Sequence, residues 1–434
     1  MLWPFGRICE PIYEENITMC KDFLLFLDSF SRLGKRAVGL ERIRALLKAL
    51  GDPQDSLAFI HVTGTNGKGS ICEMLSEVFI RSGYKTGLFT SPYIIEYNDR
   101  IRINGKNISD KALSGLLPKV REAAESTGFM ADFSQFEITQ AAAFCYFAME
   151  KCDIVILEAG LGGLLDSTNV IDKNICSVIG SVSYDHMAVL GNTLEEIAAQ
   201  KAGIIKEGCP CILSSGNDER VISVFERTAK ENGAELIIPD MGAARRLGKG
   251  LDNSFYFDGI LAYEGEYRPK MTGEHQIRNA LSVIYACDIA DREYDIGINA
   301  LREGIAGAFI PGRAQIISNS PLTILDGGHN PDAAKALASV LAVEGGEFTA
   351  LIGMSADKSI SEYVKIISPY IKEFICTDDF SERALDKNEL AKLIADCGGK
   401  ASTAESLSSG LEIIGQSEKG LICGSLFLAA EVVK

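Results

Sequence analysis

The sequence predicts an α/β fold in which mostly parallel strands form open sheets with helices on both faces. Three observations predict this fold. Apolar runs of strand length alternate with amphipathic runs of helix length along the chain, as in doubly wound folds. The strand-like runs are almost continuously apolar, which is typical of strands covered on both faces. With 434 residues, the chain is also long enough for two such domains.

The expected elements follow one another in a regular order. Strands are predicted at 57–62, 85–90, 153–158, 175–182, 209–213, 322–326, 347–352, 373–377 and 420–424. Helices are predicted at 40–50, 70–82, 110–127, 134–150, 193–206, 217–232, 276–290, 331–344 and 360–372. Several helices carry start signals: Ser134 with Glu137 and Thr193 with Glu196 form capping boxes, and Asn330 precedes a proline at the first helical position.

Two places interrupt this order. The stretch 236–272 is rich in Gly, Tyr and Phe with short alternations, and we expect a small antiparallel excursion there. The segment 309–312 follows a helix and precedes a new series of strands and helices, so we place the domain boundary there. The prediction is a larger domain at 1–308, with a P-loop-type and mostly parallel sheet, and a smaller Rossmann-like α/β domain at 309–434.

Composition narrows the class of protein. Hydrophobic residues make up 47% of the chain and charged residues 24%, as in soluble globular proteins. The net charge of −16 argues against a nucleic-acid partner, which needs a basic face. The sequence contains no apolar run of about twenty residues, so we expect no membrane span. The first ten residues lack a signal-peptide pattern. The twelve cysteines lie mostly in apolar runs, which favours a reducing cytoplasmic setting. We expect a monomer that binds small molecules.

A glycine-rich loop at 64–70 is the most informative motif. It follows the apolar run 57–62 and precedes an amphipathic run, so it joins a strand to a helix. Such a loop directs backbone N–H groups and a helix N-terminus at one point, which suits a phosphate group. The predicted phosphate-binding residues are Gly64, Thr65, Asn66, Gly67, Lys68, Gly69 and Ser70.

The spacing of this loop departs from the common nucleotide-binding pattern. That pattern has four residues between its first glycine and Gly-Lys, with Ser or Thr directly after the lysine. Here only Thr65 and Asn66 precede Gly67-Lys68, and Gly69 separates Lys68 from Ser70. The alternative interpretation is a glycine-rich turn between a strand and a helix, with a lysine there by chance.

Polar residues follow several predicted strands. In open parallel sheets, ligands bind beyond the carboxyl ends of the strands. Ser91, Glu158 and His186 each follow a different strand, and their oxygen and nitrogen atoms are suitable magnesium ligands beside phosphate oxygens. Lys201 is placed among small and apolar neighbours on a predicted helix. The alternatives are a solvated loop residue or helix cap for each carboxylate, a hydrogen-bonded structural histidine, and a surface lysine with a buried stem.

Together these motifs resemble the folylpolyglutamate synthase / dihydrofolate synthase family, within the Mur-type ligases. The resemblance covers nearly the whole chain and includes the short spacing of the glycine loop. It is carried, in this order, by residues 61–70, 90–92, 158–163, 166–169, 185–186, 190–193, 201–206, 276–279, 311–313 and 326–331.

The resemblance implies an ATP- and magnesium-dependent ligase that adds L-glutamate to a folate through an acyl phosphate. It implies catalytic roles for Lys68, Lys201 and His186, with Lys201 carbamylated by carbon dioxide. Two magnesium sites are implied, with Ser91, Glu158 and His186 as ligands. ATP would also contact Asn279, Arg313 and Asp326. Glutamate would lie near Asp326, His329 and Ser425. The pterin substrate would contact Phe136, Glu137, Leu165, Asp166 and Ser167.

Some alternatives stay open. Glu137 is also the last residue of a capping box, which is a structural role. Many members of the family have arginine at the position of Leu164 and alanine at that of Ser167, so use of dihydropteroate as a second substrate is undecided. The alternative functions are a Mur-type ligase acting on a cell-wall precursor and a nucleotide-binding protein without ligase activity.

Overall fold

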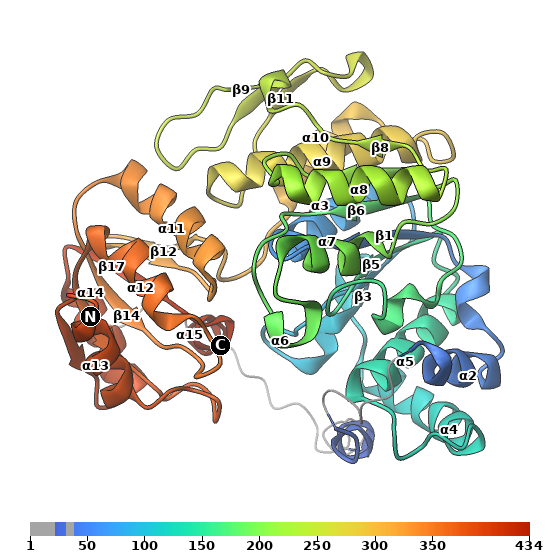
Figure 1. The fold of residues 1–434 in the computed structure, drawn as a ribbon, viewed down its shortest axis with the longest axis horizontal. Coiled ribbons are helices and arrows are strands. Elements are labelled where there is room, and N and C mark those ends of the chain that lie inside the picture. Colours follow the sequence, from blue (N-terminus) through green and yellow to red (C-terminus); the bar gives the residue numbers. More distant parts are fainter. Residues whose placement is uncertain (1–21, 32–38) are drawn as a thin grey trace.

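Two large β-sheets organise the part of the chain that the structure describes, and each carries helices on both faces (Figure 1). This computed structural model describes residues 22–31 and 39–434. The first sheet has the strand order β4-β3-β2-β5-β1-β6-β7-β8. Its strands are β1 Phe59–Thr63, β2 Thr86–Phe89, β3 Ile101–Ile103, β4 Lys106–Asn107, β5 Ile154–Glu158, β6 Cys176–Ile179, β7 Cys211–Leu213 and β8 Leu236–Ile237.

The central strands of the first sheet are parallel and buried on both faces. Ile60 and Ile156 pack in one apolar layer, and Phe59 and Val155 pack in the opposite layer. This alternation between two apolar layers explains why the sequence of each strand is continuously apolar. The first layer is completed by α3 (Lys68–Arg81), α9 (Glu274–Ala290) and α10 (Ile298–Gly307). The opposite layer is completed by α2 (Glu41–Ala49), α4 (Asp110–Ser126) and α5 (Gln135–Met149).

The second sheet has the order β12-β13-β17-β14-β15-β16, and only its edge strand β12 runs antiparallel to its neighbour. Its strands are β12 Gln315–Asn319, β13 Leu322–Leu325, β14 Phe348–Ile352, β15 Ile371–Cys376, β16 Ala401–Thr403 and β17 Lys419–Cys423. One face packs against α11 (Pro331–Glu344), α12 (Ile360–Ile367) and α13 (Lys387–Asp396). The other face packs against α14 (Leu407–Gln416) and α15 (Leu426–Val433). The predicted mixed α/β class with two sheets is confirmed.

The predicted antiparallel excursion is confirmed as a three-stranded sheet. Its order is β11-β10-β9, from β9 (Ala244–Arg246), β10 (Phe255–Phe257) and β11 (Gly265–Tyr267). In Figure 1 it projects from the top of the molecule, beyond α9 and α10. The start of the predicted excursion differs, because β8 pairs in parallel with β7 and extends the first sheet.

The predicted capping boxes of α5 and α7 (Leu194–Ala202) and the Asn330 cap of α11 are all present. The predicted helix at 360–372 was too long. It ends at Ile367, Pro369 lies in a 3-10 turn, and β15 begins at Ile371. Proline has no backbone N–H with which to continue a helix. The helix predicted at 193–206 also ends early, at Ala202 before Gly203.

The helix predicted at 217–232 corresponds to α8 (Glu219–Glu231), which covers the β6–β7 side of the first sheet together with α7. Within residues 22–31 and 39–434, no helix combines the length and apolar character needed to cross a membrane.

Candidate active site

The glycine loop lies where the neighbouring strands β2, β5, β1 and β6 end, and it opens directly into α3. Gly67 is the N-cap of this helix and has a φ of 88°, which favours glycine. A Cβ at Gly67 would lie 2.7 Å from Oδ1 of Asn279, so only glycine lets α9 approach the loop this closely. The loop is also tied to the end of β6, because the Thr65 amide donates to the Ser181 carbonyl at 2.6 Å.

A hydrogen-bond network joins the loop to α9. The Gln276 amide donates to the Ser70 hydroxyl at 3.3 Å, and the Asn279 amide donates to Gln276 Oε1 at 3.0 Å. All three side chains are buried. The structure therefore places Asn279, one of the ATP-binding residues that the resemblance implies, directly against the predicted phosphate loop.

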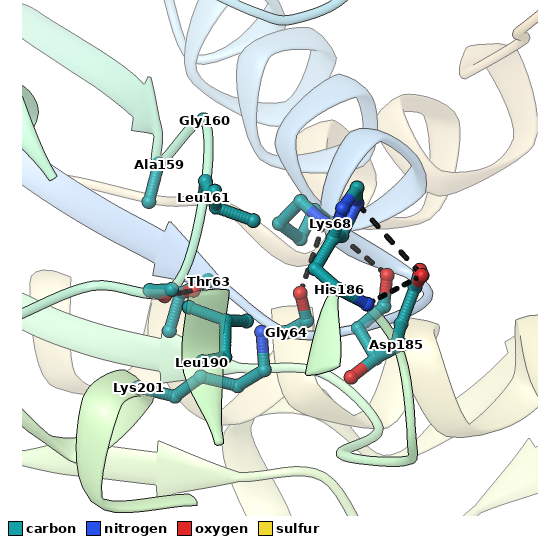
Figure 2. A pocket seen from close by; sticks show the side chains of 12 residues that line it. Thr63, Gly64, Lys68, Ala159, Gly160, Leu161, Asp185, His186, Leu190 and Lys201 are labelled. Atoms are coloured by element: carbon teal, nitrogen blue, oxygen red, sulfur yellow. Dashed lines mark hydrogen bonds and ion pairs between the residues drawn. The ribbon is translucent and has the colours of Figure 1, made fainter. Parts of the chain in front are cut away.

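Lys68 and Lys201 line one small pocket together with Gly64, Asp185 and His186 (Figure 2). Its volume is about 30 Å³. The Lys68 ammonium donates to the carbonyls of Gly64 at 2.9 Å and Thr65 at 3.2 Å. This pocket brings together the three residues for which the resemblance implies catalytic roles.

Lys201 is buried on α7 with 3% of its surface exposed, so the alternative of a surface lysine is wrong. Burial and, to a lesser extent, the nearby Lys68 charge together lower the pKa of its amine from 10.5 to about 7. A buried amine near pKa 7 is largely neutral at slightly alkaline pH and can act as a nucleophile.

Ser91 and Glu158 lie together at the ends of β2 and β5. The Ser91 amide donates to Glu158 Oε2 at 3.0 Å. Burial raises the pKa of Glu158, and the Lys68 charge and the Ser91 hydrogen bond act against that rise. The carboxylate and hydroxyl oxygens are hard donors of the kind Mg²⁺ takes.

No cluster of three His, Cys, Asp or Glu side chains suited to a metal occurs in residues 22–31 and 39–434. A magnesium site needs few protein ligands, because water and phosphate oxygens complete its shell. His186 fits such a site as a neutral ligand, since partial burial lowers its pKa against the opposing effect of the Asp185 carboxylate. It has a left-handed backbone with φ 51°, and its side chain is 46% exposed.

The residues implied for the pterin substrate are divided between surface and interior. Leu165 is 47% exposed and follows Leu164 in the chain. Phe136 is half-buried, and the centroid of its ring lies 5.6 Å from that of Phe89. Asp166 and Ser167 are buried, and the Ser167 hydroxyl has no hydrogen-bond partner.

Both carboxylate oxygens of Glu137 are engaged inside the protein. Oε2 accepts hydrogen bonds from the amide and hydroxyl of Ser134, both at 2.8 Å, which completes the capping box. Oε1 forms a buried ion pair with Arg42 at 3.2 Å. The structural role of Glu137 is therefore present, and its folate contact stays a prediction.

Asp326, His329 and Ser425 follow strands of the second sheet, the first two after β13 and Ser425 after β17. Asp326 accepts from the Ala314 amide at 2.9 Å and from the Gly328 amide at 2.8 Å, so it fixes the turn after β13. Burial raises its pKa, and the Arg313 charge opposes that rise. Burial lowers the pKa of His329 to about 4. The Ser425 hydroxyl caps α15 by accepting from the Phe427 amide at 3.2 Å.

Comparison with known proteins gives the family. Residues 62–287 match the Mur ligase middle domain, and residues 312–425 match the Mur ligase glutamate ligase domain. The dihydrofolate synthase/folylpolyglutamate synthase of Bacillus subtilis (strain 168) is 34% identical over 418 residues, covering 91% of this chain and 94% of the relative. This chain belongs to the folylpolyglutamate synthase / dihydrofolate synthase family of Mur ligases.

Further relatives support the same family membership. The folylpolyglutamate synthase of Lacticaseibacillus casei is 32% identical, covering 94% of this chain and 96% of the relative. The structure of E. coli FolC in complex with DHPP and ADP has a TM-score of 0.83 at 27% identity, covering 96% of both chains. Mycobacterium tuberculosis folylpolyglutamate synthase complexed with ADP has a TM-score of 0.86 at 27% identity, covering 96% of this chain and 98% of that one. The family membership expected from the sequence motifs is confirmed.

Sequence reasoning missed the contacts that join the two sheets of this family member. The Asn66 amide donates to Asp332 Oδ2 at 3.1 Å, and Asn330 donates to Asn66 Oδ1 at 3.2 Å. Lys358 approaches Asp185 to 4.0 Å. The sequence predicts Asn330 as a helix cap and as part of the 326–331 motif, but its separation of more than 260 residues from Asn66 leaves no local signal of the contact.

Proposed function

We propose that this protein is an ATP- and magnesium-dependent ligase that adds L-glutamate to a folate. The proposal is carried by one observation. Lys68, Lys201 and His186 share a pocket at the phosphate loop, within a chain that matches both the middle and the glutamate ligase domains of Mur ligases. Relatives with ADP bound support ATP as the nucleotide.

The chemistry requires an activated carboxylate, because oxide is a poor leaving group. We propose that the folate γ-carboxylate attacks the γ-phosphorus of ATP, which releases ADP and forms an acyl phosphate. The glutamate amine then attacks the acyl carbon, loses a proton and expels phosphate. Lys68 and the loop amides offset charge on the transferring phosphoryl group. Ser91, Glu158 and His186 would hold Mg²⁺, two ions being expected, which neutralise phosphate charge.

Lys201 is proposed to carry a carbamate. Its neutral amine attacks carbon dioxide and loses a proton, so that a cation becomes an anion facing the pocket. Its burial and its lowered pKa support this reaction. The carbamate would help to position the metal beside Glu158 and His186.

The remaining roles follow the two-sheet arrangement. We propose a larger domain at 1–308 that holds the ATP phosphates and folate, and a smaller one at 309–434 that presents glutamate. Asn279, Arg313 and Asp326 would contact ATP, and Asp326, His329 and Ser425 would contact glutamate. The residues proposed to contact the pterin substrate are Phe136, Glu137, Leu165, Asp166 and Ser167. Closing the two domains would protect the acyl phosphate from water.

We further propose a monomer working in the cytoplasm on small molecules alone. The ten cysteines among the described residues are all free, which supports a reducing compartment. Size-exclusion chromatography with light scattering tests the monomer, and a dimer at working concentration would contradict it.

A mass-spectrometric assay tests the function. The enzyme receives ATP, Mg²⁺ and glutamate with either tetrahydrofolate or dihydropteroate, and both ADP and the glutamylated product are measured. A product with tetrahydrofolate supports folylpolyglutamate synthase activity, and a product with dihydropteroate adds dihydrofolate synthase activity. Nucleotide binding without an amide product in either reaction would contradict the proposal. ADP release stimulated only by a cell-wall nucleotide sugar would favour the other Mur-type ligase.

A further inference from the structure

His61 occupies an unusual position for a polar side chain. It lies in the middle of β1, three residues before Gly64, and is completely buried. Its Nε2 lies 2.9 Å from the Thr168 hydroxyl, and its Nδ1 has no hydrogen-bond partner. Burial lowers its pKa to about 3, with the nearby Lys206 charge acting in the same direction, so the ring stays neutral. None of the roles proposed above uses this histidine.

The direction of the hydrogen bonds around Thr168 can be worked out. The Thr168 hydroxyl donates to Asp166 Oδ1 at 2.6 Å, and the Thr168 amide donates to the same oxygen at 3.0 Å. A hydroxyl has one proton, so once it donates to Asp166 it must accept from His61. His61 therefore carries its proton on Nε2. The resulting chain runs from His61 through Thr168 to Asp166.

The chain ends on the loop that lines the pocket. Asp166 Oδ2 accepts from the Leu161 amide at 2.7 Å, and Leu161 lines the same pocket as Lys68 and Lys201. On the same strand as His61, the Thr63 hydroxyl donates to the Gly162 carbonyl at 2.6 Å. Two side chains of β1 thus hold the loop of residues 160–168, one at Gly162 and the other at Thr168.

We propose that His61 is a positioning residue for the acid substrate, fixing the loop of residues 160–168 through Thr168 and Asp166. This inference rests on the proposed function, because that loop carries the residues assigned to the pterin substrate. The loop differs from the phosphate loop, which is held by Ser181 and α9. Loss of His61 should therefore weaken use of the acid substrate more than use of ATP.

The kinetic test compares His61→Leu, which lacks the donor, with His61→Gln, whose amide nitrogen can replace Nε2. We expect His61→Leu to lower kcat/KM for the folate about tenfold, the size of effect expected for one lost buried hydrogen bond. KM for ATP should stay within about twofold, and His61→Gln should recover most of the loss. Equal effects on both substrates, or a wild-type kcat/KM in His61→Leu, would overturn the proposal.

A double-mutant cycle separates this role from a general packing defect. Thr168→Val breaks the chain at its centre, and Thr168→Ser keeps the hydroxyl as the matched control. If the chain acts as a unit, His61→Leu combined with Thr168→Val should cost no more than either substitution alone. Fully additive effects would contradict the chain.

Nitrogen NMR provides a readout that does not depend on activity. The chain has four histidines, and the signals of His61 are assigned from their loss in His61→Gln. We expect the neutral Nε2–H form across the working pH range, with a shifted Nε2 signal in Thr168→Val. A ring protonated on Nδ1 would overturn the inference. If the NMR result holds and no folate is glutamylated, the proposed function fails while the hydrogen-bond chain stands.

Discussion

The carboxamide of Asn330 donates to Oδ2 of Asp185 at 3.3 Å and so joins the second sheet to the end of β6 in the first. Its oxygen accepts from the Ala333 amide at 2.8 Å and caps α11. The same nitrogen also reaches Asn66 of the phosphate loop. One buried side chain therefore connects the helix beside the proposed glutamate residues with the loop proposed to bind ATP.

Asn330→Asp tests this connection. Aspartate caps a helix as well as asparagine does, so α11 should keep its cap. The new oxygen would face the Asp185 carboxylate and Asn66 Oδ1 without a donor. We expect kcat/KM for ATP to fall about tenfold, since leaving buried polar atoms unsatisfied costs about 1–3 kcal/mol. Steady-state kinetics at varied ATP concentration measures this kcat/KM.

The matched control for Asn330→Asp is the reverse exchange at an exposed cap. Asp386 caps α13 in the second sheet by accepting from the Asn388 and Glu389 amides. Asp386→Asn should leave both kinetics and melting temperature near those of the wild type. An Asn330→Asp enzyme with wild-type ATP kinetics would show that the connection between the sheets does not affect nucleotide use.

Lys68→Ala tests the phosphate loop. We expect an intact fold and a loss of folate- and glutamate-dependent ADP formation of about a hundredfold or more, as when an electrostatic contact to the transition state is removed. ADP release is measured by a coupled assay, and circular dichroism checks the fold. Lys111→Ala, at an exposed position on α4, is the control. Retained turnover in Lys68→Ala would contradict the assignment of the loop.

The central parts of both sheets could be predicted because their strands are long and apolar on both faces. The prediction missed β3, β4, β12 and β16. Of these, β4 and β16 are short edge strands with exposed residues, where solvent on one side leaves little apolar pattern. The missed helix α10 begins at Ile298, and its N-cap residue Gly297 has no side chain to cap it, so no start signal marks the helix. The missed helix α15 is mostly apolar and lacks the polar face by which helices are recognised.

The candidate site was predictable wherever a motif is contiguous in sequence. The glycine loop carries its own strand, turn and helix, and Lys201 was singled out by its apolar neighbours. The contacts of His61 with Thr168 span 107 residues, and those of Arg42 with Glu137 span 95. Pairings of this kind depend on which strands become neighbours, which local patterns do not specify.

Glu137→Gln separates the two roles of Glu137. Glutamine can still complete a capping box, but it cannot form the ion pair with Arg42, whose side chain is 10% exposed. Breaking a buried ion pair typically costs about 3 kcal/mol, so we expect a matching fall in the free energy of unfolding. Urea denaturation measures it.

The control for Glu137→Gln is Glu196→Gln in the exposed capping box of α7, where we expect a change below about 0.5 kcal/mol. Steady-state kinetics then compares KM for folate between Glu137→Gln and the wild type. A stable Glu137→Gln enzyme with a raised KM for folate would favour substrate contact over the structural role.

Lys201→Ala tests the carbamate. The variant should lose activity about a hundredfold, on the scale of other lost electrostatic contacts, and short carboxylates such as acetate should restore part of it by supplying the missing anion. Activity of the wild type should also fall when carbon dioxide is removed from the buffer. The control is Lys230→Ala, at an exposed position on α8, which should neither lose activity nor respond to acetate. Near wild-type turnover in Lys201→Ala would rule the carbamate out.

The pKa of Lys201 also predicts how stability depends on pH. In buffer free of carbon dioxide, the amine loses its proton near pH 7 in the folded chain and near pH 10.5 in the unfolded one. Burial of the charged form therefore destabilises the wild type fully below pH 7, and the penalty disappears as pH rises to 10.5. Lys201→Met lacks this penalty. We expect it to be more stable than the wild type by a few kcal/mol at pH 7, since one pKa unit corresponds to about 1.4 kcal/mol. Urea denaturation across pH 7–10 should show this advantage shrinking, and a constant difference would contradict the buried, depressed amine.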